Sequence, residues 1–172
     1  DIFTAKNGKS VMVDNTDAEG RLVLIDGLAR AGEEGATHVV DIATLTGAVV
    51  RALGPSVAGI LGTDRDLVRR VIRSGENHGE PFWELPLVEE YKESLKTPYA
   101  DLNNIAAGGL AGAITAGLFL REFVPNGAAW AHLDIAGPMF KDKEWKYFDA
   151  GALGFGVKTL VDLCERFRDP LA

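Results

Sequence analysis

The 172 residues are enough for one domain with one hydrophobic core, and their composition, 47% hydrophobic and 25% charged, is ordinary for a soluble globular protein. The net charge of −7, from 25 acidic and 18 basic residues, argues against a nucleic-acid-binding surface, because such surfaces need clustered Lys and Arg. Cys164 is the only cysteine, so no internal disulfide can form, and a reducing, cytoplasmic location is expected.

The start of the chain has no basic segment followed by an apolar run, so no signal peptide is predicted. The longest uncharged, mainly apolar run covers residues 105–120. It is shorter than the ~20 residues of a membrane span and rich in glycine, so a buried helix is the better interpretation. The chain has no initiator methionine and begins abruptly, as though cut from a longer protein.

Strands and helices alternate along the chain, which predicts an α/β fold with a central mixed sheet flanked by helices. In chain order, we expect a strand at 10–13, a helix at 21–31, a strand at 37–45, a helix at 64–75, a helix at 112–124, a strand at 130–136 and a helix at 154–167. The run at 37–45 is β-branched and apolar, as in a strand buried on both faces. The helix at 112–124 is apolar nearly all round and should also be buried.

Residues 76–101 combine prolines with aromatic side chains, which indicates an ordered excursion over the surface rather than a linker. Gly108, Gly109 and Gly112 would let the helix that follows them approach a neighbour closely. One face of the final helix carries four small or aliphatic residues, namely Val157, Leu160, Val161 and Cys164. We expect that face in the core, with Cys164 as a small core residue rather than a catalytic thiol.

The segment best suited to chemistry is Asn-Thr-Asp-Ala-Glu-Gly-Arg-Leu at 15–22, between a predicted strand and a predicted helix. Only a small alanine separates Asp17 from Glu19, so an irregular turn can direct both carboxylates at one centre. Carboxylate oxygens suit Zn, Mn or Mg, and one carboxylate can bridge two metals. Arg21, at the helix start, can present its guanidinium to an anion. The alternative is a solvated acidic turn in which Asp17 is the helix N-cap.

A second segment, residues 41–48, lies at the carboxyl end of a predicted strand, where open α/β sheets bind their ligands. Thr46 and Gly47 can offer backbone groups to an extended substrate there. The alternative is a plain turn between a strand and a loop.

A third segment places His132 and Asp134 on the same face of a predicted strand. They are possible metal ligands, but a buried pair bonded to each other is the favoured interpretation. His38 and His78 have no partner pattern, so we expect them to be structural or exposed.

Taken together, these segments resemble the leucyl aminopeptidase family, also called the cytosol aminopeptidases. The octapeptide at 15–22 is the signature of that family. The segments Asp-Ile-Ala-Thr-Leu-Thr-Gly-Ala at 41–48, Ala-Gly-Ala-Ile-Thr-Ala-Gly-Leu-Phe-Leu at 111–120 and Trp-Ala-His-Leu-Asp-Ile-Ala-Gly at 130–137 follow in the family's order. The resemblance covers essentially the whole chain and implies a phosphorylase/hydrolase-like fold. It also implies release of amino-terminal residues such as Leu from peptides, by a water activated by two divalent metals, Zn or Mn.

The resemblance assigns roles to individual residues. Asp17 and Glu19 are metal ligands, with Glu19 bridging the two metals, and Arg21 is the catalytic residue that holds a bicarbonate as general base. The remaining site residues bind substrate, and they are Asn15, Thr44, Leu45, Gly47, Ala136 and Met139. Among them, Leu45 acts through its carbonyl and Gly47 through its amide. His132 and Asp134 are not metal ligands in the family.

Members of the family are longer than this chain. In them an amino-terminal domain comes first, and the upstream half of the catalytic domain supplies a lysine and two aspartates as further metal ligands, with a second, catalytic lysine. Residues 1–172 therefore correspond to the carboxyl-terminal part of the peptidase catalytic domain, incomplete at its amino-terminal side. By this resemblance the chain carries only part of the active site.

Two other functions stay open beside a peptidase with peptide substrates. The chain can be a non-catalytic assembly module or inert fragment, since the family forms hexamers around its catalytic domains and a homo-oligomer is implied. Nucleic-acid binding, a side role of some members, is disfavoured by the acidic balance. No membrane association is expected.

Overall fold

The computed structural model describes residues 1–144 and 148–170. The helices are α1 (Glu19–Glu33), α2 (Gly47–Leu53), α3 (Arg65–Asn77), α4 (Gly112–Arg121) and α5 (Val157–Arg166), with the 3-10 helices η1 (Thr16–Ala18) and η2 (Glu89–Leu95). The strands are β1 (Ile2–Thr4), β2 (Ser10–Met12), β3 (His38–Ala43), β4 (Ala58–Gly62), β5 (Phe82–Glu84), β6 (Leu102–Asn103), β7 (Ala129–Asp134), β8 (Phe140–Lys141) and β9 (Gly151–Ala152).

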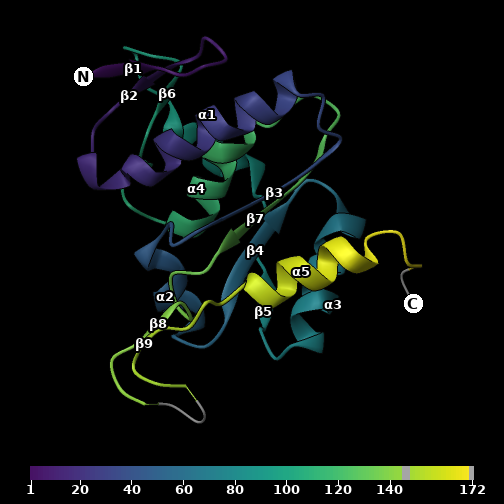
Figure 1. Cartoon of the computed structure of the whole chain (residues 1–172). Coiled ribbons are helices and arrows are strands. Elements are labelled where there is room, and N and C mark those ends of the chain that lie inside the picture. Colours follow the sequence, from purple (N-terminus) through teal and green to yellow (C-terminus); the bar gives the residue numbers. More distant parts are fainter. Residues whose placement is uncertain (145–147, 171–172) are drawn as a thin grey trace.

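A four-stranded mixed sheet forms the centre of the fold, in the order β3-β7-β4-β5. Strand β3 runs parallel to β7, β7 antiparallel to β4, and β4 parallel to β5. Helices α1 and α4 lie over one face of this sheet, and α3 and α5 lie over the other (Figure 1). The expected α/β fold, with a central mixed sheet flanked by helices, is confirmed.

A smaller sheet brings distant parts of the chain to the start of α1. It has three strands in the order β1-β2-β6 and lies beyond α1 and α4 (Figure 1). Strand β2 is parallel to β6, with Met12 opposite Asn103. The segment at 15–22, which follows β2, therefore begins beside residues that come much later in the sequence.

Strand β7 separates two hydrophobic clusters, because its side chains alternate between the two faces of the sheet. Trp130 belongs to the cluster that contains residues of α1 and α4, whereas Ala131 and Leu133 belong to the one that contains residues of α3 and α5. By the same alternation, His132 and Asp134 share the Trp130 side, which is the side of α1.

Strand β3 corresponds to the strand expected at 37–45, but its expected burial on both faces is wrong. It is an edge strand of the sheet, its first residue His38 is exposed, and the others are only half-buried. An apolar, β-branched composition fits a central strand and a half-covered edge strand equally well, because β-propensity measures packing on a pleated surface.

Helix α5 forms as expected but turns a different face inward. Three of the four residues expected in the core are exposed, namely Val157, Val161 and Cys164. The buried residues are Thr159, Asp162 and Leu163. The Glu80 carboxylate accepts hydrogen bonds from the Thr159 amide at 3.0 Å and the Thr159 hydroxyl at 2.6 Å, and Asp162 lies 3.2 Å from His78 Nε2. These polar contacts with the end of α3 fix the orientation of the helix.

Of the three glycines expected to allow close packing before α4, one does so. A Cβ atom on Gly112 would lie 2.9 Å from the Cβ of Ala48 in α2. Gly108 and Gly109 have no neighbour within 4 Å of such an atom, and their φ angles are +79° and +67°. They shape the turn before α4, since glycine adopts positive φ at little cost.

The other expected elements correspond to β2, α1, α3, α4 and β7, and residues 76–101 form an ordered segment that contains β5 and η2. Helix α2 and strand β4 were not expected. His38 and His78 are exposed, as predicted. Among the described residues, the longest apolar helices are still too short or too polar to cross a membrane.

Candidate functional site

Asp17 lies in η1, which follows β2, and Glu19 is the first residue of α1. Asn15 caps η1, because its Oδ1 accepts a hydrogen bond from the Asp17 amide at 2.9 Å. Helix α1 begins at Glu19 with no side-chain cap, so the alternative with Asp17 as its N-cap is wrong. Both carboxylates are exposed, and neither accepts a hydrogen bond or ion pair from the described residues. Their oxygens are therefore available to a divalent cation.

Asn104, which is fully buried just after β6, holds this segment in place. Its Oδ1 accepts hydrogen bonds from the amides of Asp14 at 2.9 Å and Asn15 at 3.2 Å, and its Nδ2 donates to the Asn15 carbonyl at 2.7 Å. Its own carbonyl accepts from Arg21 Nη1 at 2.7 Å. Asn104 was not among the expected site residues, although two consecutive asparagines among apolar residues are a signal of buried polar contacts.

Arg21 lies in the first turn of α1, and only 8% of its surface is exposed. Its guanidinium carbon lies 5.9 Å from the centre of the Phe119 ring. Nη1 is engaged by Asn104, whereas the buried Nε has no partner and Nη2 bonds none of the described residues. Nε and Nη2 together form an edge that can donate two parallel hydrogen bonds to a planar anion.

Two opposing influences act on the pKa of Arg21. Burial lowers the pKa of the Arg21 guanidinium below its ordinary value, and the negative charge of Asp134 raises it again in part. Since arginine stays protonated in proteins, the free edge belongs to a cation. A buried cation with unused donors favours an anionic ligand.

The loop between β3 and α2 carries Thr44, Leu45 and Gly47, and it is fixed by the Asp134 carboxylate of β7. Oδ1 accepts from the amides of Leu45 at 3.0 Å and Thr46 at 3.3 Å, while Oδ2 accepts from the Thr46 hydroxyl at 2.6 Å. Thr44 and Gly47 are exposed. The Leu45 carbonyl and the Gly47 amide bond no other backbone group in the described part of the chain. Both are free to bind a ligand.

The end of β7 lies beside this loop. The Ile135 amide donates to the Ala43 carbonyl at 2.9 Å, and the Ala136 amide lies 3.4 Å from Asp134 Oδ1. Ala136 is thereby brought to the same carboxylate as Leu45 and Thr46. Met139, further along, is 37% exposed, and its backbone pairs with Leu153 instead.

His132 and Asp134 are each 1% exposed, but the expectation that they bond each other is wrong. His132 Nδ1 lies 2.5 Å from Asp41 Oδ1 of β3, and Trp130 Nε1 donates to Asp41 Oδ2 at 2.6 Å. Asp41 is directly opposite His132 in the sheet register. Residues opposite each other on neighbouring strands are closer than residues two apart on one strand, so the cross-strand pair forms. The other ring nitrogen, Nε2 of His132, is buried and has no hydrogen-bond partner in the part of the chain that the structure describes.

Asp17 and Glu19 do not make a complete metal centre by themselves. Within residues 1–144 and 148–170, no three His, Cys, Asp or Glu side chains gather as a metal site. A cavity of about 500 Å³ lies elsewhere, between the loops around Val57 and Pro81 and the start of α5. None of the expected site residues lines that cavity, so the candidate site is the pair of loops at 15–21 and 44–47.

Comparisons with known proteins identify the family of this chain. A sequence model of the cytosol aminopeptidase family, catalytic domain, matches residues 1–161. A probable cytosol aminopeptidase of Synechococcus elongatus is 51% identical over 164 residues, which are 94% of this chain and 33% of that protein. Leucine aminopeptidase A1, chloroplastic, of Solanum lycopersicum is 48% identical over 162 residues, which are 94% of this chain and 27% of that protein.

The fold agrees as well. A solved structure of a mutant tomato leucine aminopeptidase superposes with a TM-score of 0.91 at 48% identity, over 96% of this chain and 32% of that one. The chain spans about a third of the length of the curated relatives it matches. Because the family model matches almost the whole chain, the chain belongs to the cytosol aminopeptidase family.

Proposed function

We propose that this member of the cytosol aminopeptidase family supplies part of the active site of a metal-dependent enzyme that releases amino-terminal residues, such as Leu, from peptides. The observation that carries the proposal is the arrangement around α1. Among the described residues, the carboxylates of Asp17 and Glu19 have no partner, and they stand directly before a buried Arg21 whose Nε has none either. In the whole protein, residues 1–172 are proposed to be the carboxyl-terminal part of the catalytic domain.

Asp17 and Glu19 are the residues of this chain that would hold two divalent metals, Zn or Mn, with Glu19 bridging them. Carboxylates that accept no hydrogen bond from the described residues keep their charge and lone pairs for cations. Two carboxylates leave coordination positions open, and the lysine and aspartates expected from an upstream segment would complete them. When bound, such metals polarise the attacking water and the peptide carbonyl.

Arg21 would hold a planar anion, bicarbonate, at the edge formed by Nε and Nη2. The bond from Nη1 to the Asn104 carbonyl, 2.7 Å long, fixes the direction in which that edge points. Held there by Arg21, a bicarbonate would supply a general base for the attacking water. Arg21 itself stays protonated and orients the base.

The loop between β3 and α2 would bind the peptide backbone, through the Leu45 carbonyl as acceptor and the Gly47 amide as donor. Both groups are free of other backbone partners in the described part of the chain. Thr44, Gly47, Ala136 and Met139 would line the pocket for the first side chain. Asn15, the last expected substrate contact, has its Oδ1 engaged as the cap of η1, which leaves its Nδ2 for substrate.

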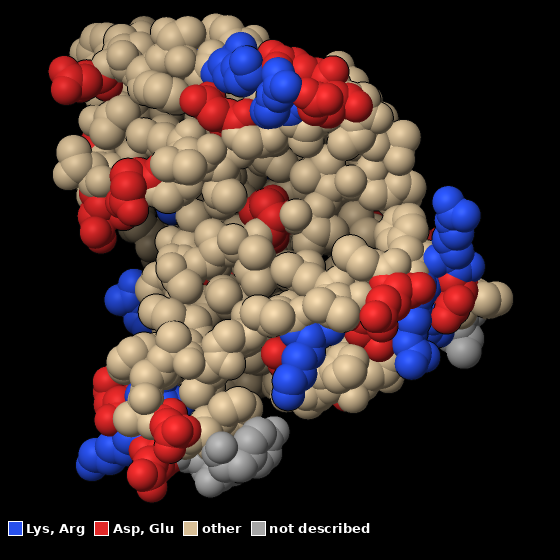
Figure 2. Space-filling model, in the orientation of Figure 1, with Lys and Arg blue, Asp and Glu red and all other residues tan. Residues whose placement is uncertain are grey.

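The parent protein is proposed to work on peptides in the cytoplasm as a homo-hexamer. The relatives bear both cytosol and chloroplastic names, so the compartment differs within the family. A role in nucleic-acid binding is not proposed. On the face drawn in Figure 2, Lys and Arg side chains stand beside Asp and Glu rather than in one continuous basic area.

The alternative is that the chain acts as an assembly module or inert fragment. One observation favours it, because no three metal-ligating side chains gather among the described residues. The test is hydrolysis of leucine p-nitroanilide with added Mn or Zn, by this chain alone and by the full-length protein. We expect activity only in the full-length protein, and its loss in Asp17→Asn and Glu19→Gln. An inactive full-length protein with bound metal would refute the peptidase, and an active isolated chain would refute the shared site.

A further inference from the structure

The carboxylate of Asp134 is buried, and both of its oxygens accept hydrogen bonds. Asp134 is the last residue of β7, and only 1% of it is exposed. The sheet register pairs it with Ala43, the last residue of β3, so its side chain stands where the loop to α2 begins. It accepts from the Leu45 amide, the Thr46 amide and the Thr46 hydroxyl at 3.0, 3.3 and 2.6 Å.

Thr46 transmits this constraint to the start of α2. While its hydroxyl donates to Asp134 Oδ2, the same oxygen accepts from the Val49 amide at 3.1 Å. The peptide planes on both sides of Thr46 are therefore fixed from two directions. Those planes carry the Leu45 carbonyl and the Gly47 amide, which are the two backbone groups assigned to the substrate.

A plain turn needs no buried charge. Burying a carboxylate is unfavourable unless its oxygens are hydrogen-bonded, and a neutral side chain could cap the same amides at lower cost. Here one carboxylate holds three donors of one loop at once, the Leu45 amide and the amide and hydroxyl of Thr46.

We propose that Asp134, through Thr46, is a positioning residue that sets the Leu45 carbonyl and the Gly47 amide for the substrate backbone. This inference rests on the proposed peptidase function. Asp134 touches neither the metal ligands nor, in this assignment, the substrate. It acts by holding the loop whose backbone groups do.

The test uses the full-length protein with four substitutions and three measurements. Thr46→Val removes the hydroxyl of Thr46 but keeps the shape of its side chain, whereas Thr46→Ser keeps the hydroxyl. Asp134→Asn removes the charge of the carboxylate. Thr159→Val is the matched control, since its hydroxyl also donates to a buried carboxylate, Glu80 Oε2, at 2.6 Å, but at the start of α5. Each variant is measured for kcat and KM on leucine p-nitroanilide, for bound metal, and for its thermal unfolding midpoint.

We expect Thr46→Val and Asp134→Asn to raise KM about ten-fold or more, since each misplaced hydrogen bond to substrate costs a factor of roughly 2–10. Bound metal should stay at the wild-type level, and Thr46→Ser should stay within about two-fold of wild-type KM. Thr159→Val should lower the unfolding midpoint while leaving KM unchanged. This pattern separates positioning from a general loss of stability.

Other outcomes overturn the proposal. Wild-type KM in folded Thr46→Val and Asp134→Asn rejects it, and so does a Thr46→Ser variant as impaired as Thr46→Val. If neither Thr46→Val nor Asp134→Asn folds, the carboxylate serves folding alone and the positioning role is rejected. A wild-type protein without aminopeptidase activity rejects the proposed function itself, and the positioning role with it. If the wild-type protein is an active aminopeptidase and the variants only fail to fold, the positioning role alone is rejected and the proposed function stands.

Discussion

Asn104 donates a hydrogen bond from Nδ2 to the carbonyl of Asn15 across 2.7 Å, and so joins residues 89 positions apart in the chain. The same side chain accepts from the Asn15 amide at 3.2 Å. Both polar groups of the Asn15 backbone are therefore held by one buried amide. Because Asp17 and Glu19 follow directly, the position of the proposed metal ligands depends on a residue that is not itself a ligand.

Replacing Asn104 should therefore weaken metal binding. Asn104→Ala leaves the Asp14 and Asn15 amides and the Asn15 carbonyl without their partner. In the full-length protein, we expect Zn or Mn affinity to fall about 10- to 100-fold, as is usual when a residue that orients metal ligands is lost. Titration calorimetry measures the affinity, and activity should recover when metal is added in excess.

The neighbouring asparagine provides the control for that experiment. Asn103 donates to the Asp14 side chain at 2.5 Å, and no hydrogen bond joins its side chain to Asn15 in the described part of the chain. Asn103→Ala should change metal affinity much less than Asn104→Ala. Equal effects of the two substitutions would show that stability of β6, rather than placement of the loop, controls the metal site.

Two helical glycines should respond in opposite ways to alanine. A Cβ on Gly75, in α3, would meet the Glu80 carbonyl oxygen and come within 2.7 Å of the Phe82 ring. A Cβ on Gly27, in α1, has no neighbour within 4 Å. We expect Gly75→Ala to lower the free energy of unfolding by about 1–3 kcal/mol through overpacking. Gly27→Ala should raise it by roughly 1 kcal/mol through helix propensity. Urea unfolding of this chain measures both, and a stable Gly75→Ala variant would contradict the packing of α3 against β5.

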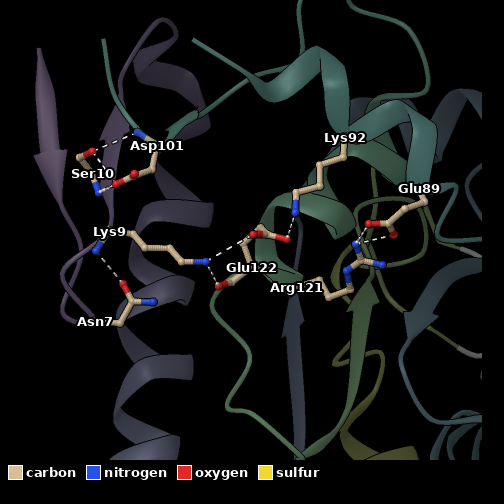
Figure 3. Close-up of polar contacts among 8 residues, drawn as sticks. All are labelled: Asn7, Lys9, Ser10, Glu89, Lys92, Asp101, Arg121 and Glu122. Carbon is tan, nitrogen blue, oxygen red and sulfur yellow. Dashed lines mark hydrogen bonds and ion pairs between the residues drawn. The ribbon is translucent and has the colours of Figure 1, made fainter. Parts of the chain in front are cut away.

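Glu122 should make the stability of the chain depend on acid pH. Its carboxylate lies 2.6 Å from Lys92 Nζ and 3.3 Å from Lys9 Nζ (Figure 3). Glu122 directly follows α4, Lys92 is in η2 and Lys9 lies between β1 and β2, so the two ion pairs join these three parts of the chain. Burial alone would raise the pKa of Glu122, but the hydrogen bonds and charges of Lys92 and Lys9 outweigh it, so the pKa lies below the ordinary 4.5.

The sign of the pH effect follows from that direction. The unfolded state takes up a proton at Glu122 more readily than the folded state does, so the stabilisation is complete above pH 4.5 and is lost as the pH falls below it. Urea unfolding of the chain at a series of acid pH values should show a steeper loss of stability for wild type than for Glu122→Gln. The control is Glu90→Gln, at an exposed residue with no ion pair in the described part of the chain. Equal slopes for wild type and Glu122→Gln would contradict the bridge.

Local patterns were enough to predict most of the helices and the longer strands, and to single out the segment proposed to bind metal, because the residues concerned are close in sequence. Asp17, Glu19 and Arg21 lie within one short segment, and the helix that follows is visible in its apolar spacing. Features set by pairing between distant segments were not predictable in this way. Asp41 and His132 are 91 positions apart, and only the register of β3 with β7 makes them partners.

The predicted burial was wrong for β3 and for α5, for related reasons. The apolar run of β3 does not reveal that the strand lies at the sheet edge. The apolar stripe of α5 does not reveal that Glu80 binds Thr159 and that Asp162 lies beside His78. In both cases the neighbours decide which side is covered, and these neighbours come from other parts of the chain.

Arg21 provides the most direct test of the proposed chemistry. With Nη1 held by the Asn104 carbonyl at 2.7 Å, its Nε and Nη2 can bond two oxygens of one planar anion. Arg21→Lys keeps the positive charge but offers a flexible point donor, so a bicarbonate would be held loosely. A general base displaced by about 1 Å loses its alignment with the water. We expect kcat of the full-length protein to fall about 100- to 10,000-fold, the usual range of general-base catalysis.

Bound metal distinguishes this role from that of the carboxylates. Arg21→Lys should keep its metal nearly intact, because Asp17 and Glu19 are the proposed ligands and neither is hydrogen-bonded to Arg21 in the described part of the chain. Glu19→Gln, by contrast, removes the charge of the proposed bridging ligand and should lower metal content and kcat together. Metal analysis and kinetics on both variants check this difference. Full activity of Arg21→Lys, or loss of its metal to the extent seen in Glu19→Gln, would show that Arg21 does not hold the base.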